Sequence, residues 1–321
     1  MSNQPLVAID GATGYVGNHL AACLVDSGFN VRCIVHPGAK ERDIAFLKSI
    51  GTEVFAASLD SADPGLTTAL TGCDVAVHLI GSIAPKKGER LEDLHGAQSA
   101  ALIVACKASG VAKIVMVTAL GTACDAMSSY HRTKWQSEEN VRKSGLQFVI
   151  VRPSLIIGRL VGQRDSKLIA RYTELIRTRP AVPVIGGGGN KIQPVFVGDL
   201  AAAIQKFIES SQFDGQTLEI GGAEILTMKQ FVEKLIASQG SHKKVRGVPL
   251  FAAGLMAAVC ETVQDVPTVS RDQVKLSVQD NVCKANALPN LLGAEPTSVD
   301  QALLTYNGAG STDKITAQPA R

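Results

Sequence analysis

Short apolar runs alternate with stretches of helical periodicity through the first half of the chain. The run at 6–9 is followed by three glycines and then by a helix-like stretch at 18–28, in which apolar residues recur at helical spacing. Continuous apolar runs are typical of strands that are buried on both faces of a parallel sheet. The pattern therefore predicts an α/β protein with a doubly wound parallel sheet. The expected strands cover 6–9, 31–35, 53–57, 75–80, 113–118 and 148–152.

The alternation becomes less regular after residue 153. Helices are expected at 166–177, 200–209 and 228–237, with proline and glycine between them and a further strand at 216–220. Three regions follow from this change of pattern. They are a first domain over 1–153, a smaller and less regular substrate lobe over 154–305 that returns the strand near 216–220 to the sheet, and a disordered polar tail over 306–321.

Composition narrows the classes of function. The 321 residues carry a formal net charge of +3 with scattered lysines and arginines, which argues against a nucleic-acid partner. No apolar run approaches the ~20 residues of a transmembrane helix, and we expect no signal peptide. The 7 cysteines form no C-x-x-C pair, so a reduced, cytoplasmic protein is expected. We find neither the spacing of a metal site nor a G-x-S-x-G nucleophile motif.

Three glycines spaced three residues apart follow the first predicted strand. Gly11 allows a tight turn, Gly14 lets the backbone approach a pyrophosphate, and Gly17 lets the following helix pack close to the strand. The helix N-terminus would face the negative charge of a bound dinucleotide. The alternative is a strand-to-helix turn that needs small residues and binds nothing. The other loop residues that we expect at the cofactor are Thr13, Tyr15 and Val16.

The end of the second strand bears on the choice of cofactor. An acidic residue here would bind the adenosine ribose hydroxyls and repel a 2′-phosphate, but the sequence has none. His36, Lys40 and Arg42 lie nearby instead. The loop therefore favours NADP over NAD, which remains possible, while the alternative is a basic loop that is merely solvated.

Two further strand ends would line the carboxyl edge of the sheet, where ligands bind in such folds. Gly81 follows the fourth strand, and Pro153 after Arg152 ends the sixth, where it would border the nicotinamide. His78 lies inside the apolar fourth strand, and we expect it to be packed and hydrogen-bonded rather than catalytic.

Thr118, Tyr130 and Lys134 form the candidate catalytic set. Tyrosine and lysine four residues apart share one helix face, and an ammonium beside a phenol stabilises the phenolate. Such a tyrosine can exchange a proton with a carbonyl or alcohol oxygen while a nicotinamide moves a hydride. Thr118, at the end of the fifth strand, would bond the same oxygen, and Lys134 would also hold the nicotinamide ribose. The alternative is a helix N-terminus with a solvated lysine.

The stretch 249–263 is apolar almost all round. It is expected to form a buried or hydrophobic surface helix of the second lobe. The alternative is a helix that docks on a membrane surface or a partner protein, although a polar face rich in lysine and arginine is missing.

Together these motifs resemble the atypical and extended short-chain dehydrogenase/reductase superfamily. The resemblance rests on the glycine motif 11–17, on Tyr130-x-x-x-Lys134 and on Val-Arg-Pro-Ser at 151–154. Further segments are similar to the branch of the dehydrogenase-like accessory subunit of respiratory complex I and its bacterial relatives. These segments lie at 94–96, 117–121, 193–199 and 270–274.

The resemblance implies a Rossmann fold that binds NAD(P) at the three glycines, with Tyr130 as acid/base and Lys134 as its partner. It also places Ser58 and Leu59, after the third strand, at the adenine. The sequence departs from the family at Ser58, where many relatives carry aspartate, at Thr118, which lacks the usual serine pair, and at His95, which replaces asparagine.

Two functions follow from this resemblance. The first is an NADP-dependent oxidoreductase, or an epimerase/dehydratase-like enzyme, acting on a small organic substrate. The second is a non-catalytic accessory or assembly protein that binds NADPH and docks on a partner complex.

Overall fold

The computed structural model describes residues 4–59, 63–81, 91, 93–162, 164–265 and 267–307. The chain forms two compact units, the first made of 1–152 with 201–218, and the second of 153–200 with 219–321. The first unit therefore takes in 201–218, which comes after 153–200 in the chain. The predicted tail lies outside the described residues from 308 onward.

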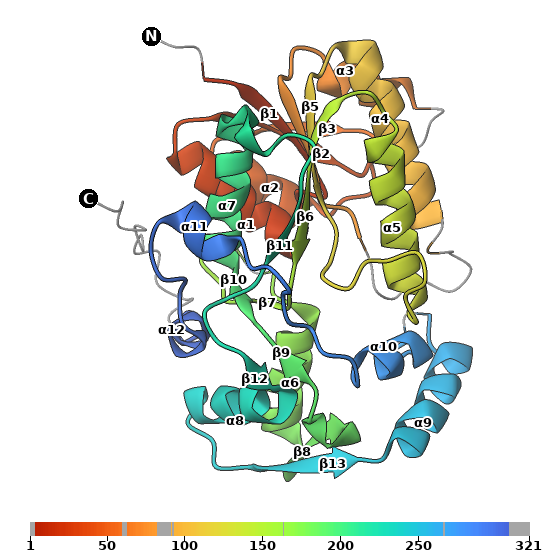
Figure 1. The fold of residues 1–321 in the computed structure, drawn as a ribbon, viewed down its shortest axis with the longest axis vertical. Coiled ribbons are helices and arrows are strands. Elements are labelled where there is room, and N and C mark those ends of the chain that lie inside the picture. Colours follow the sequence, from red (N-terminus) through yellow and green to blue (C-terminus); the bar gives the residue numbers. More distant parts are fainter. Residues whose placement is uncertain are drawn as a thin grey trace. The chain divides into compact units, whose positions relative to one another are not determined.

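A seven-stranded sheet of order β11-β6-β5-β4-β1-β2-β3 forms the centre of the first unit. Strands β1 to β6 pair in parallel, with Val7 opposite Val75 and Val31 in the two neighbours of β1. Helices α1, α2 and α7 lie on one face, and α3, α4 and α5 on the other (Figure 1). The predicted doubly wound α/β fold is confirmed. The elements are β1 (Leu6–Asp10), α1 (Tyr15–Asp26), β2 (Asn30–Val35), α2 (Glu41–Ser49), β3 (Glu53–Ala56), α3 (Pro64–Leu70), β4 (Val75–His78), the π-helical turn η1 (Asp93–Ala97), α4 (Gln98–Ser109), β5 (Lys113–Val117), α5 (Ser129–Arg142), β6 (Gln147–Pro153), α7 (Val197–Glu209), the 3-10 turn η3 (Ser211–Phe213) and β11 (Thr217–Ile220).

The central strands are buried on both faces. All residues of β4 and β5 are buried, as are four of the five in β1. Helices on each side exclude water from the sheet, so apolar residues are favoured at consecutive positions rather than at alternate ones. This is why the strands read as continuous apolar runs in the sequence.

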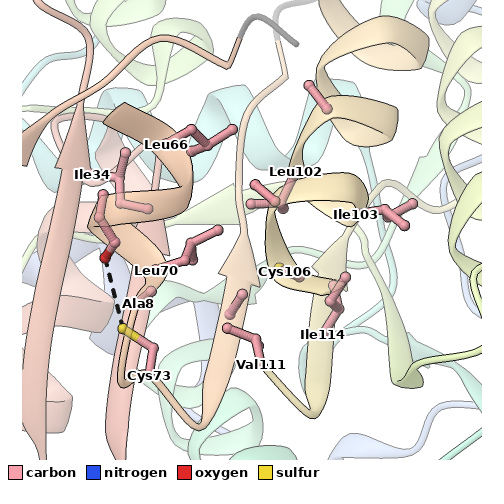
Figure 2. Close-up of a cluster of buried hydrophobic side chains, with 14 of the residues drawn as sticks. Ala8, Ile34, Leu66, Leu70, Cys73, Leu102, Ile103, Cys106, Val111 and Ile114 are labelled. Carbon is pink, nitrogen blue, oxygen red and sulfur yellow. Dashed lines mark hydrogen bonds between the residues drawn. The ribbon is translucent and has the colours of Figure 1, made fainter. Parts of the chain in front are cut away.

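One buried cluster joins the sheet to α3 and α4. Leu66 and Leu70 of α3 pack with Leu102 and Cys106 of α4 over strand residues that include Ile114 (Figure 2). Each fully buried aliphatic side chain contributes about 1.5–3 kcal/mol relative to an exposed one. The cluster therefore fixes both helices on this face of the sheet.

The second unit is built from short strand pairs and helices. Its longest pair joins β8 to β13 in parallel, with Ala181 opposite Lys244. The β7–β10 pair is also parallel, whereas β9–β12 is antiparallel. The elements are β7 (Ile156–Ile157), α6 (Lys167–Thr178), β8 (Ala181–Ile185), the 3-10 turn η2 (Gly186–Gly188), β9 (Lys191–Ile192), β10 (Val195–Phe196), β12 (Leu226–Thr227), α8 (Met228–Ser238), β13 (Lys244–Val248), α9 (Leu250–Val263), α10 (Arg271–Leu276), α11 (Leu288–Leu292) and α12 (Val299–Leu304).

Helix α9 corresponds to the apolar stretch at 249–263. Ala253 and Ala257 are buried, whereas Phe251, Leu255 and Val259 are exposed. The helix thus lies at the surface and presents apolar side chains there. Within the described parts of the chain, no helix combines the length and the apolar character needed to cross a membrane.

Truncation of a buried side chain on α4 tests the core cluster. We expect Leu102→Ala to lower the free energy of unfolding by about 2–5 kcal/mol, because it removes buried methyl groups and leaves a cavity. Val104→Ala on the same helix is the control, since Val104 is 64% exposed and should change stability by less than about 0.5 kcal/mol. Urea denaturation measures both, and equal effects of the two substitutions would contradict this account of the core.

Candidate cofactor and active site

The glycine turn brings the end of β1 and the start of α1 into backbone contact. Gly11 has a φ of +63°, in the left-handed region that favours glycine. Its carbonyl accepts a hydrogen bond from the Gly14 N–H at 2.8 Å. A Cβ on Gly17 would lie 2.4 Å from the Gly11 oxygen and 2.6 Å from the Ala12 Cα, both backbone atoms. Only glycine at position 17 permits this close packing.

The first turn of α1 is suited to an anion. Gly14 is its N-cap, and no acidic residue stands in that turn, so the positive end of the helix dipole lies at the carboxyl edge of the sheet. The buried Asn18 side chain donates to the Ala12 carbonyl at 2.7 Å and fixes the loop. A backbone cradle without a capping side chain fits the pyrophosphate of a dinucleotide. Its other predicted contacts, Thr13, Tyr15 and Val16, are half-buried.

The loop after β2 contains the predicted basic residues. His36, Lys40 and Arg42 are exposed. The Gly38 N–H donates to His36 Nδ1 at 3.0 Å, which orders the turn, and Lys40 is the N-cap of α2. The loop therefore presents the cationic side chains of Lys40 and Arg42 where an acidic residue would bind the ribose of NAD.

After β3, Ser58 and Leu59 are half-buried. The backbone N–H of Ser58 donates to the Asp63 carboxylate at 2.6 Å, and the same carboxylate caps α3 through Gly65. Asp63 thus orders the segment predicted to contact adenine. Pro153 is the last residue of β6.

Lys134 is a residue of α5 that is only 2% exposed, and its amine reaches the backbone that follows β4. Its Nζ donates to the Ile80 carbonyl at 2.7 Å. A Cβ on Gly81 would lie 2.6 Å from the same nitrogen, so glycine there leaves room for the amine. Burial lowers the pKa of Lys134 to about 8, while the nearby charges of Asp10 and Glu138 act in the opposite direction.

Tyr130 lies one helical turn before Lys134 on α5, on the same face. Its ring packs edge-to-face against the His95 ring, with centroids 5.5 Å apart. Burial raises the pKa of Tyr130 to about 12, so its phenol is protonated at neutral pH.

His95 is buried beside this pair. Its Nδ1 forms a 2.7 Å hydrogen bond with the Thr133 hydroxyl. Burial and the neighbouring Lys134 lower the pKa of His95 to about 3, so the imidazole is neutral. In the sequence, His95 stood out as a departure from the family and as part of the segment 94–96 that resembles the complex I subunit branch.

Thr118 is directed toward a different partner. Its hydroxyl donates to Glu138 at 2.8 Å. Glu138 is fully buried and also bonds Arg142 and Arg152, the latter through two nitrogens at 2.9 and 2.6 Å. This network ties α5 to β5 and β6. The structure therefore brings Tyr130 and Lys134 to one helix face and places Thr118 in the network that anchors the helix.

Sequence reasoning missed Asn18 and Glu138. An acidic residue four positions after Lys134 lies on the same face of the helix, and that spacing was the available signal for Glu138. Asn18 carried no comparable signal, because polar residues are common in the first turn of a helix.

Comparison with known proteins agrees with this geometry. Residues 11–169 match the family model described as NAD(P)H-binding. The mitochondrial NADH dehydrogenase (ubiquinone) 1 alpha subcomplex subunit 9 of Arabidopsis thaliana is 26% identical over 297 residues, which cover 88% of this chain and 72% of that protein. An NAD(P)H azoreductase of Xenophilus azovorans is 22% identical over 297 residues, covering 90% and 96%.

Among solved structures, the UDP-glucose 4-epimerase of Thermotoga maritima superposes with a TM-score of 0.73 at 18% identity, covering 94% of this chain and 96% of the epimerase. The predicted resemblance to the short-chain dehydrogenase/reductase superfamily and to the complex I subunit branch is confirmed. The chain thus contains a domain for a nicotinamide cofactor, on a fold shared by reductases and epimerases.

Adding one methyl group at Gly17 tests the turn. We expect Gly17→Ala to lower the free energy of unfolding by about 1–3 kcal/mol, because backbone atoms of the turn must move apart. The control is Gly254→Ala on α9, where the added Cβ meets no heavy atom within 4 Å. Chemical denaturation measures both, and a Gly17→Ala protein as stable as the wild type would contradict the close packing.

Proposed function

We propose that the protein is an NADPH-dependent reductase of a small organic substrate, with Tyr130 as proton donor and Lys134 as its partner. One observation carries this proposal. The buried amine of Lys134 lies at the carboxyl end of β4, one helical turn from Tyr130, and β4 adjoins the strand that carries the glycine turn.

Reduction is the direction that the phenol favours. The nicotinamide supplies a hydride when the cofactor is bound. A phenol with a pKa of about 12 holds its proton at neutral pH and can give it to a carbonyl or azo acceptor. The ammonium of Lys134 then stabilises the phenolate that remains, since opposite charges attract strongly where water is excluded. The epimerase or dehydratase alternative would use the same pair.

The remaining predicted residues take supporting roles in this proposal. His36 and Lys40 would meet the 2′-phosphate of NADPH, and Gly81 would face the nicotinamide side. Ser58 and Leu59 would contact adenine, and Pro153 would border the nicotinamide. Thr118 would position α5 through Glu138. All seven cysteines are free, which fits the cytoplasmic location that we propose.

A second candidate function is an accessory or assembly role, and the surface of α9 favours it. Phe251, Leu255, Val259 and Val263 are between 55% and 81% exposed and recur every fourth residue, so they form one apolar stripe. Such stripes are typical of protein interfaces. The complex I subunit among the relatives supports a protein partner with a complementary apolar surface.

Substitution of the phenol tests the enzymatic proposal. Tyr130→Phe should lower turnover of azo dyes, quinones or small ketones with NADPH by about 10²- to 10⁴-fold, because the proton donor is lost. Its affinity for NADPH, followed by nicotinamide fluorescence, should stay within a few-fold of the wild type. The wild type should bind NADPH more tightly than NADH.

Tyr172→Phe on α6 is the matched control, because it removes another half-buried phenol and should leave turnover unchanged. Full turnover by Tyr130→Phe would refute the catalytic role. Absence of binding to either cofactor would refute cofactor-dependent chemistry as a whole and leave the accessory role.

Polar substitution of the stripe tests the accessory role. Phe251→Ser combined with Leu255→Ser should release the protein from its partner complex. The release is measured as a smaller particle size of the protein and as loss of the partner on co-purification. Thermal stability should change little, since both side chains are exposed. Val104→Ser, at another exposed apolar residue, should leave the association intact. An unchanged association in the double variant would exclude α9 as the contact.

A further inference from the structure

Asp10 is a buried carboxylate at the cofactor edge of the sheet. It is the last residue of β1, immediately before Gly11, and is 1% exposed. One oxygen accepts the backbone N–H groups of Leu79 and Ile80, at 2.8 and 3.3 Å. A buried carboxylate is costly unless it is well bonded, and Asp10 uses its bonds to hold the end of β4.

The second oxygen of Asp10 contacts His78. His78 Nδ1 lies 2.5 Å from Asp10 Oδ2, and His78 is also 1% exposed. His78 is packed and hydrogen-bonded, as the sequence predicted. Its Nε2 is buried and has no hydrogen-bond partner among the residues that the structure describes. The two oxygens of Asp10 thus hold the imidazole of His78 and the backbone at the end of β4.

The peptide of Ile80 connects Asp10 to Lys134. Its N–H donates to Asp10, and its carbonyl accepts the Lys134 amine at 2.7 Å. Gly81, the next residue, leaves the space that the amine occupies. Any shift of this peptide would move the acceptor that places Lys134.

We propose that Asp10 is a positioning residue for Lys134, which holds the end of β4 for the amine and keeps the amine protonated by its negative charge. The consequence for cofactor binding rests on the proposed function; the placement of the amine does not. Asp10 thereby connects the glycine turn to the Tyr130-Lys134 pair within one unit of the structure.

Other groups also act on the Lys134 amine. Charged and titratable residues face it from each element packed around it. Among the described residues they are Asp10 on β1, Glu138 on α5 itself and His95 in η1. His95 in turn lies close to His78 on β4 and to the ring of Tyr130 on α5. Burial lowers the pKa of Lys134 to about 8, and the charges of Asp10 and Glu138 oppose that shift. Loss of the Asp10 charge should lower the pKa further.

The pH dependence of stability measures this effect without cofactor. Below a pH of about 8, the folded protein holds a buried ammonium, which is unfavourable. As the pH rises above that value, the folded state loses the proton before the unfolded state does. The free energy of unfolding therefore rises until the unfolded lysine titrates, near pH 10.4. For each protein, the pH dependence of stability of the same protein with the added substitution Lys134→Met is subtracted, which isolates the rise due to Lys134.

We expect the rise to begin near pH 8 in the wild type and about one pH unit lower in Asp10→Asn. Asp74→Asn is the matched control, because Asp74 also bonds a strand N–H, that of Leu6, but at the opposite end of β1. Its rise should begin where that of the wild type does. Asp10→Ser, which keeps an acceptor oxygen without the charge, serves if Asp10→Asn does not fold.

An unchanged onset in the neutral Asp10 variants, or an equal shift in Asp74→Asn, would overturn the assignment. Titration with NADPH at a series of pH values is the second measurement. The midpoint of the pH dependence of NADPH binding should be lower in the neutral Asp10 variants than in the wild type. Failure of the wild type to bind NADPH would refute the proposed function, whereas the stability curves would still decide the role of Asp10.

Discussion

The buried carboxylate of Glu138 is the interaction on which the geometry of the site depends. It accepts hydrogen bonds from two nitrogens of Arg152 on β6, from one nitrogen of Arg142 on its own helix and from the hydroxyl of Thr118, which directly follows β5. Removing one partner of such a buried pair typically costs about 3–5 kcal/mol, because the other charge is left without compensation. The register of α5 on the sheet is therefore fixed by charge as well as by packing.

Placement of α5 determines which face meets the carboxyl edge of the sheet. With Glu138 turned toward β5 and β6, Lys134 one turn earlier reaches the end of β4, and Tyr130 lies one turn beyond it. Burial then lowers the pKa of Lys134 and raises the pKa of Tyr130, because it disfavours the charged form of each group. A protonated tyrosine beside an easily titrated lysine is suited to donating a proton rather than to taking one.

Most of the first unit could be predicted from the sequence, because parallel strands covered on both faces leave continuous apolar runs. The glycines of the turn could also be predicted. Gly11 has a positive φ, and Gly17 packs against backbone atoms so closely that a Cβ would not fit. The Glu138 network was not predicted, because it joins α5 to β6 and to the residue after β5. Contacts between residues so far apart in the chain leave no local pattern in the sequence. In the second unit the β8–β13 pair joins segments about sixty residues apart, and strands of two residues such as β7 leave no periodicity to detect.

The return of 201–218 to the first unit has a consequence for how the chain matures. Strand β11 occupies the edge of the sheet beside β6, yet it is made only after much of the second unit. Until β11 has been synthesised, β6 is therefore an unpaired edge strand, and its free backbone groups can pair with another nascent chain. Aggregation of the newborn protein, rather than slow packing of its core, is the hazard that this topology creates.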